Sequence, residues 1–149
     1  MNKTNNTSSN EIQVITNICY NTPINFDLKE FIKSTLSVLK LSVGLFEFTF
    51  IDNKKIKEIN KAHLKKTYAT DIISFNLGST TNPIGDIYIS TEKAQENAIK
   101  LNKDLNSEIK LLIVHGILHL LGYEDYTEKQ KQIMQKEEER VLNILENSF

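Results

Sequence analysis

Apolar and polar residues alternate in four short segments of the chain, which is the pattern of strands with one buried face. The first segment is Ile12–Tyr20, and the second is Leu45–Ile51, where phenylalanines occupy every other position. The last two are Asp71–Phe75 and Gly85–Ser90, and the turn-rich residues 78–83 join them. The pattern therefore predicts four strands.

The remaining apolar residues recur at the spacing of helices with one buried face. The expected helices span Asp27–Leu41, Lys54–Lys65, residues 90–101, residues 107–121 and Thr127–Leu145. The fourth is the most apolar segment of the chain, and the fifth begins with a capping box formed by Thr127 and Gln130. These elements predict an α+β fold, in which about five helices cover a mixed four-stranded sheet and the apolar helix is innermost.

The length of the chain fits a single domain, which we place at residues 11–149. The first ten residues are polar and predict a disordered tail without the apolar core of a secretory signal. Because the apolar helix is short and contains two histidines, we expect no membrane span. The single cysteine, Cys19, excludes an internal disulfide and favours a cytoplasmic location. A net charge of −1 excludes a generally basic nucleic-acid surface but leaves room for a local patch.

Two histidines, His115 and His119, lie four residues apart in the apolar helix, and Asp125 follows six residues later. Residues at this spacing lie on one face of a helix, so both imidazoles point toward a common point. Gly122 is expected to end the helix and to let the chain turn Asp125 toward that point. Two nitrogens and one oxygen suit a divalent metal, and we predict one zinc ion per chain. We therefore expect the innermost helix to be a zincin-like metal-binding helix. The alternative is a pair of hydrogen-bonded core histidines.

Three protein ligands leave a fourth position for water, which is typical of catalytic zinc sites. The zincin protease motif places a glutamate directly after the first histidine, where this chain has Gly116. A protease would therefore lack its general base at the usual position. The glycine itself indicates either that a ligand approaches the helix closely or that the helix packs tightly on the sheet.

The run from His115 to Asp125, HGILHLLGYED, resembles the signature of the YbeY family of bacterial metal-dependent endoribonucleases. The segments Ile59–Asn60, Thr70–Phe75 and Gly85–Ser90 agree with that family in order and spacing, and the resemblance extends from about Ile12 to the C-terminus. It implies a zinc-dependent, cytoplasmic endoribonuclease that prefers single-stranded RNA. The implied roles are maturation of the 3′ end of the 16S rRNA precursor and quality control of the small ribosomal subunit. The implied partners are that subunit and its assembly proteins.

Carried over to this chain, the resemblance makes His115 and His119 the first two zinc ligands. Asp125 stands where the family has a third histidine; Glu124 is the adjacent alternative acid, and His63 is the weaker alternative. A family arginine thought to act in catalysis is replaced here by Leu64.

Either of two neighbouring lysines, Lys65 and Lys66, is expected to supply the positive charge that this arginine would provide. Ser74 either binds a phosphate or bonds to the backbone, and Asp86 either orients a ligand histidine or is a turn residue. The expected catalytic residues are therefore Lys65, Lys66 and Ser74.

Two charged runs remain. Six lysines between Lys54 and Lys66 predict either a patch that contacts RNA phosphates or a solvated helix face. The acidic run Glu137–Glu139 is expected to be solvated. Besides the endoribonuclease, two further hypotheses stand: a non-catalytic ribosome-assembly factor with a structural metal, and a metalloprotease.

Overall fold

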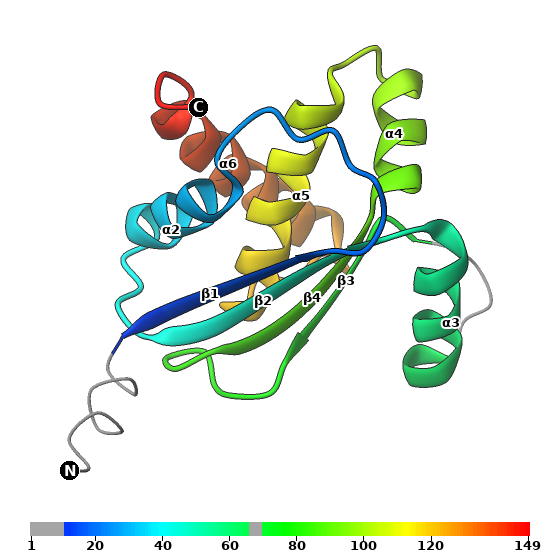
Figure 1. The fold of residues 1–149 in the computed structure, drawn as a ribbon. Coiled ribbons are helices and arrows are strands. Elements are labelled where there is room, and N and C mark those ends of the chain that lie inside the picture. The colour runs from blue at the N-terminus through cyan, green and yellow to red at the C-terminus, as the bar shows by residue number, and fades with distance from the viewer. Residues whose placement is uncertain (1–10, 66–69) are drawn as a thin grey trace, which may run out of the picture.

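The computed structural model describes residues 11–65 and 70–149, so the predicted tail and Lys66 lie outside the described residues. Four strands are present: β1 (Ile12–Ile18), β2 (Gly44–Ile51), β3 (Ile72–Asn76) and β4 (Ile84–Ser90). The described helices are α2 (Leu28–Val38), α3 (Asn53–Leu64), α4 (Thr91–Lys100), α5 (Leu105–Leu120) and α6 (Glu128–Leu145) (Figure 1). The predicted α+β fold, with four strands and about five helices, is confirmed.

The four strands form one mixed sheet in the order β1-β2-β4-β3. The pairs β1–β2 and β2–β4 are parallel, and β3 runs antiparallel to β4 at one edge. At the other edge, β1 is shorter than predicted and ends at Ile18, which is 54% exposed. The alternation of apolar and polar residues, which continues to Tyr20, therefore extends past the end of the strand.

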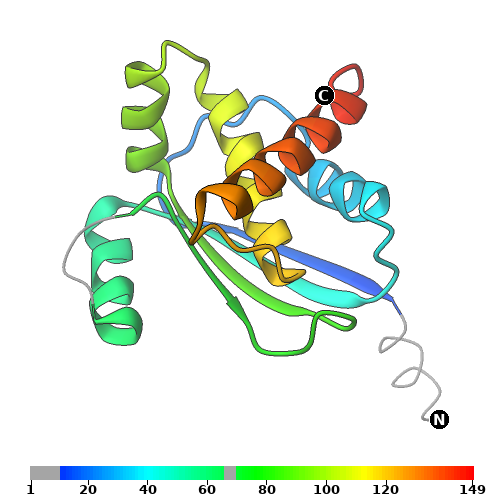
Figure 2. The ribbon, with the colours of Figure 1, turned by 180° about the vertical axis from the view of Figure 1, so that it is seen from behind.

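One face of the sheet is covered by helices, and α5 lies at the centre of this layer (Figures 1 and 2). It contacts β3 and β4 on one side and α2, α4 and α6 on the others. Its apolar residues pack against the three phenylalanines of β2, Phe46, Phe48 and Phe50, each of which is fully buried. The prediction that the apolar helix is innermost is confirmed.

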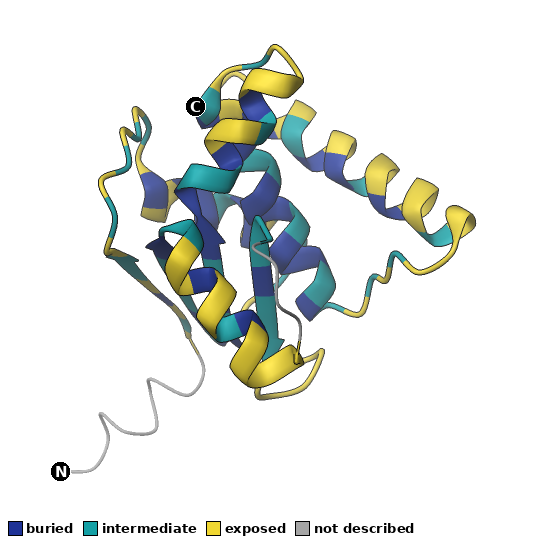
Figure 3. Ribbon diagram, turned by 90° about the vertical axis from the view of Figure 1, so that its right-hand side faces the viewer, coloured by how far each residue is buried: buried dark blue, intermediate teal, exposed yellow. Residues whose placement is uncertain are grey.

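The opposite face of the sheet is covered in part by α3, which lies beyond the end of β2 (Figure 1). Ile56 of α3 packs with Ile51 and Ile73 in a small apolar cluster separate from the main core. Much of the surface of α3 is exposed (Figure 3). The exposed residues include the lysines of the helix and the lysine at its C-cap; they are Lys54, Lys55, Lys57, Lys61 and Lys65. No helix within the described ranges has the length and apolar character needed to cross a bilayer.

Candidate metal centre

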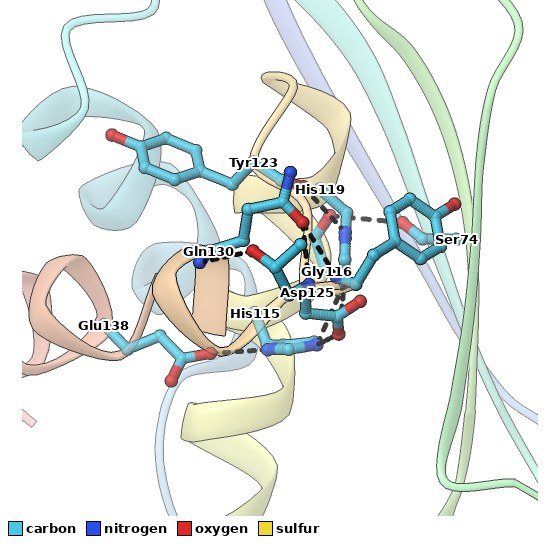
Figure 4. A network of polar contacts seen from close by, with 10 residues as sticks. Ser74, His115, Gly116, His119, Tyr123, Asp125, Gln130 and Glu138 are labelled. Carbon is cyan, nitrogen blue, oxygen red and sulfur yellow. Dashed lines mark hydrogen bonds and ion pairs between the residues drawn. The ribbon is translucent and has the colours of Figure 1, made fainter. Parts of the chain in front are cut away.

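Three side chains converge at the C-terminal end of α5, where the helix faces β3 (Figure 4). The Nε2 atoms of His115 and His119 lie 3.1 Å apart. Asp125 Oδ2 lies 3.8 Å from the first of these atoms and 3.5 Å from the second. Tetrahedral ligands at the usual zinc distances would lie about 3.3–3.6 Å from one another. The separations of 3.1, 3.5 and 3.8 Å scatter around this range. Within the described residues, this group could therefore hold a metal ion.

The other nitrogen of each imidazole is occupied by a fixed partner (Figure 4). His115 Nδ1 lies 2.5 Å from Glu138 Oε2, and His119 Nδ1 lies 2.9 Å from the carbonyl oxygen of Tyr123. Because both partners are acceptors, each ring carries its proton on Nδ1 when neutral. The Nε2 atom of each ring then carries the lone pair that can bind an ion close to Asp125. Metal-binding histidines in proteins are usually held in this way.

Glu138 was expected to be solvated, and that expectation is wrong. Glu138 is only 8% exposed, and its carboxylate contacts His115. It lies on the buried face of α6 with Met134, Val141 and Leu145, at helical spacing. A charged side chain buried among apolar residues needs a partner. The helical spacing of Glu138 with these three residues was therefore the sequence signal of its burial, and the prediction from sequence missed it. Its neighbour Glu139 is exposed.

The turn after α5 brings the third ligand to the site. Gly122 has φ 100° and donates its N–H to His119 O at 3.1 Å, while Tyr123 N–H donates to Leu118 O at 3.1 Å. This pair of bonds is a Schellman motif, in which glycine allows the positive φ. It directs Tyr123 O toward the His119 ring and leads the chain on to Asp125. The prediction that Gly122 ends the helix is confirmed.

Strand β3 fixes the histidine-bearing turns of α5 to the sheet. Ser74 Oγ donates to Gly116 O at 3.1 Å, and Asn76 Nδ2 donates to Leu120 O at 3.0 Å. A methyl group on Gly116 would lie 2.8 Å from Ile72 Cδ1. Of the two interpretations of Gly116, the structure therefore favours close packing of helix on sheet. Of those of Ser74, it shows the bond to the backbone.

A cavity of about 460 Å³ lies beside the three converging residues, between α3, β3 and the end of α5. Its lining includes His115, His119 and three carboxylates, those of Asp71, Glu124 and Asp125. No lysine or arginine within residues 11–65 and 70–149 lines it. The described part of its lining is therefore acidic, and a bound cation would offset much of that charge.

Several predicted residues lie elsewhere. Lys65 caps α3 with φ 56° and does not line the cavity, whereas its neighbour Leu64 does. His63 packs edge-on against the ring of Phe75, with ring centres 5.6 Å apart, and does not belong to the metal-binding group. Asp86 accepts a hydrogen bond from Tyr88 at 3.0 Å and has no contact with either ligand histidine.

Two ionisable groups of the site have shifted pKa values. Burial opposes protonation of His115, but the hydrogen bond and charge of Glu138, with the charges of Asp125 and Asp71, raise its pKa overall. Burial, together with the charge of Glu108, raises the pKa of Asp71, although His115 lowers it in part. Asp71 also accepts a hydrogen bond from Asn97 at 3.1 Å. In the metal-free protein, protons therefore compete with a metal ion for His115.

The chain is similar to known proteins over most of its length. The model of the family described as "Endoribonuclease YbeY" matches residues 7–146. A relative of that name from Christiangramia forsetii is 39% identical over 120 residues, which cover 79% of this chain and 82% of the relative. One from Flavobacterium psychrophilum is 31% identical over 133 residues, covering 85% and 95%.

A solved structure supports the fold. The solution structure of TM1509 from Thermotoga maritima superposes with a TM-score of 0.60 at 21% identity, covering 92% of this chain and 93% of that protein. Together with the family match over most of the sequence, these similarities identify the chain as a member of the endoribonuclease YbeY family.

Proposed function

We propose that this protein is a zinc-dependent endoribonuclease that prefers single-stranded RNA and acts in 3′-end maturation of 16S rRNA. Membership of a family described as endoribonucleases supports RNA as the substrate. We further propose a cytoplasmic role in quality control of the small ribosomal subunit, with that subunit and its assembly proteins as partners.

One observation carries the metal-dependent part of the proposal, namely the convergence of His115, His119 and Asp125 with the spacing of ligands to one ion. Two imidazole nitrogens and one carboxylate oxygen suit zinc, and three protein ligands leave one position open. When bound, such an ion would polarise a phosphoryl oxygen and lower the pKa of water to about 7.

The residues around this group would prepare it for the ion. Glu138 and the Tyr123 carbonyl hold the two imidazoles in one tautomer, so each Nε2 is available without rearrangement. The bonds from Ser74 and Asn76 hold the same turns of α5 against β3. The adjoining cavity, at about 460 Å³, is large enough for a nucleotide-sized ligand.

The two other hypotheses receive less support. A structural metal would not need a cavity beside its ligands, and closed structural zinc sites usually have four protein ligands. A zincin protease would need its glutamate where Gly116 packs against Ile72. As catalytic residues, Lys65, Lys66 and Ser74 stay predictions, and the Ser74 proton is already donated to Gly116 O.

The test is cleavage of an end-labelled, single-stranded fragment of precursor 16S rRNA by purified protein, beside a duplex of the same sequence and casein. We expect cleavage of the single strand, which a chelator stops and zinc restores, and intact casein. The His119→Ala variant should be inactive. Casein digestion that depends on His115 and His119, without RNA cleavage, would support the protease instead.

A further inference from the structure

The metal centre borders two cavities. His115 and Asp125 line the cavity of about 460 Å³ beside β3, and they also line a second one of about 210 Å³ on the side of α6. The rest of the second cavity comes from α6, through Lys131, Gln135 and two further residues, Met134 and Glu138. Any ion held by His115 and Asp125 would therefore be close to both cavities.

The two cavities differ in charge. The first has three carboxylates and, among the described residues, no cationic side chain. The second is lined by two carboxylates, those of Asp125 and Glu138, and by Lys131, whose side chain forms no ion pair with any carboxylate in the described ranges. Binding to nucleic acid depends largely on contacts between phosphates and cationic side chains. Among the described residues, it is therefore the second cavity that offers a phosphate a cationic side chain.

The arrangement of α6 suits this role. Lys131 and Gln135 are one helical turn apart and exposed, so they present an ammonium and an amide on the same face. Met134 and Glu138 are buried beneath them, and Glu138 is already bonded to His115. At about 210 Å³, the second cavity is smaller than typical pockets for whole small molecules, which start near 300 Å³. Its size suits a backbone phosphate better than a base.

We propose that this second cavity is a subsite for a backbone phosphate of the RNA strand, bound by Lys131 and assisted by the Gln135 amide. Because His115 and Asp125 line both cavities, a strand that occupies both passes the metal centre. Nucleotides on one side of the scissile phosphate occupy the first cavity, and the phosphate on the other side contacts Lys131. This proposal rests on the proposed function, since it assumes that RNA is the substrate.

The test measures equilibrium binding of a 2′-O-methylated single-stranded RNA over a salt series, with the RNA checked for integrity after each measurement. The proteins are wild type, Lys131→Gln and the matched control Lys136→Gln, which removes one exposed charge elsewhere on α6. Loss of one phosphate contact should flatten the logarithmic salt slope by about 0.7 in Lys131→Gln. The control should keep the wild-type slope, and both variants should keep the wild-type metal content.

Shortened RNAs make the test specific to a subsite. If Lys131 contacts a phosphate on one side of the scissile bond, trimming the RNA from one end should abolish the difference between Lys131→Gln and wild type. Trimming from the other end should preserve it. Equal salt slopes for wild type and Lys131→Gln would overturn the subsite. So would a difference in slope that disappears whichever end of the RNA is trimmed.

Cleavage of unmodified RNA by the wild type, run alongside, separates the two proposals. Cleavage combined with equal slopes would reject the subsite alone, whereas absence of both binding and cleavage would reject the proposed function as well.

Discussion

At the scale of single residues, the centre depends on how each histidine ring is held. Glu138 contacts His115 Nδ1, so the carboxylate fixes both the ring orientation and the position of its proton. The bond is internal to the protein, because Glu138 is only 8% exposed. We therefore treat Glu138 as a residue that positions a ligand rather than as a ligand itself.

The Glu138→Gln variant tests this role. Its amide keeps the shape of the side chain but removes the negative charge, so zinc affinity should fall by roughly 10–100-fold, as for other partners of ligand histidines. Competition with a zinc-binding dye would measure the affinity. The Glu139→Gln variant, altered at the exposed neighbouring residue, should bind zinc like wild type. Unchanged affinity in Glu138→Gln would show that the His115 ring is held by other contacts.

Asp125 is expected to be the third ligand, so Asp125→Ala should weaken zinc binding by at least roughly 10–100-fold. Asp125→His should retain the ion, because imidazole is an equally suitable zinc ligand. The same competition measurement applies. Wild-type affinity in Asp125→Ala would mean that another acid, such as Glu124 in the same cavity, takes its place.

Asp71 carries a stability cost that depends on pH. Burial raises its pKa, helped by Glu108, so the folded state disfavours the charged carboxylate relative to the unfolded state. Below the ordinary aspartate pKa of about 3.9, the carboxyl group is neutral in both states and this cost is absent. As the pH rises through the raised pKa of the folded state, the carboxyl group ionises and the corresponding stability is lost.

Asp71→Asn removes this cost, so the metal-free variant should be more stable than metal-free wild type at pH 7. The difference should shrink as the pH falls toward 4. Urea unfolding followed by circular dichroism at both pH values would measure it. The metal-free protein is required, because a bound cation would favour the charged carboxylate. A variant less stable than wild type at pH 7 would indicate that the carboxylate is stabilised by its neighbours.

At the scale of elements, the turn after α5 links helix geometry to metal binding. Gly122 has φ 100°, a conformation that costs other residues about 1–2 kcal/mol. Gly122→Ala should therefore lower stability by that order and also weaken zinc binding, because the turn carries Asp125. Gly122→Asn should recover part of both losses, since asparagine tolerates positive φ better. Urea unfolding and zinc competition are the measurements. A loss of stability with unchanged zinc affinity would show that the geometry of this turn does not control metal binding.

The sequence predicted the elements well because each has a strong local signal. The period of Phe46, Phe48 and Phe50 marked β2, and Thr127 with Gln130 marked the start of α6, where both capping bonds are present. The pairing of β2 with β4 had no local signal, because the two strands are distant in sequence. The choice of β4 over β3 as the partner of β2 depends on packing across the whole sheet.

The candidate site was predictable only in part, for the same reason. His115, His119 and Asp125 are close in sequence, so helix geometry was enough to bring them together. Glu138 lies 23 residues from His115 on another helix, and its acidic neighbours suggested a solvated surface. Similarly, spacing alone did not show that Leu64, and not Lys65, lines the cavity.

At the scale of the whole molecule, the metal centre joins three parts of the fold. The ligands come from α5 and the turn after it, α6 supplies Glu138, and β3 holds the end of α5 through Ser74 and Asn76. An ion that binds only the folded protein should therefore stabilise all three parts together. At zinc concentrations of 100 times the dissociation constant, the gain should be about 2.7 kcal/mol.

Removal of the metal should lower the thermal midpoint of the whole protein in one transition. Differential scanning calorimetry with and without a chelator would measure the shift. In the His115→Ala, His119→Ala double variant, the chelator should have no effect. A chelator-dependent shift of equal size in that variant would place the stabilising ion elsewhere.

The most direct test of the central claim is a zinc titration of metal-stripped protein, with RNA cleavage measured at each point. Activity should be absent at the start, rise linearly and level off at about one zinc per chain, and it should stay absent in the double variant. Full activity of the stripped protein, or a plateau that the double variant also reaches, would contradict metal-dependent cleavage at His115, His119 and Asp125.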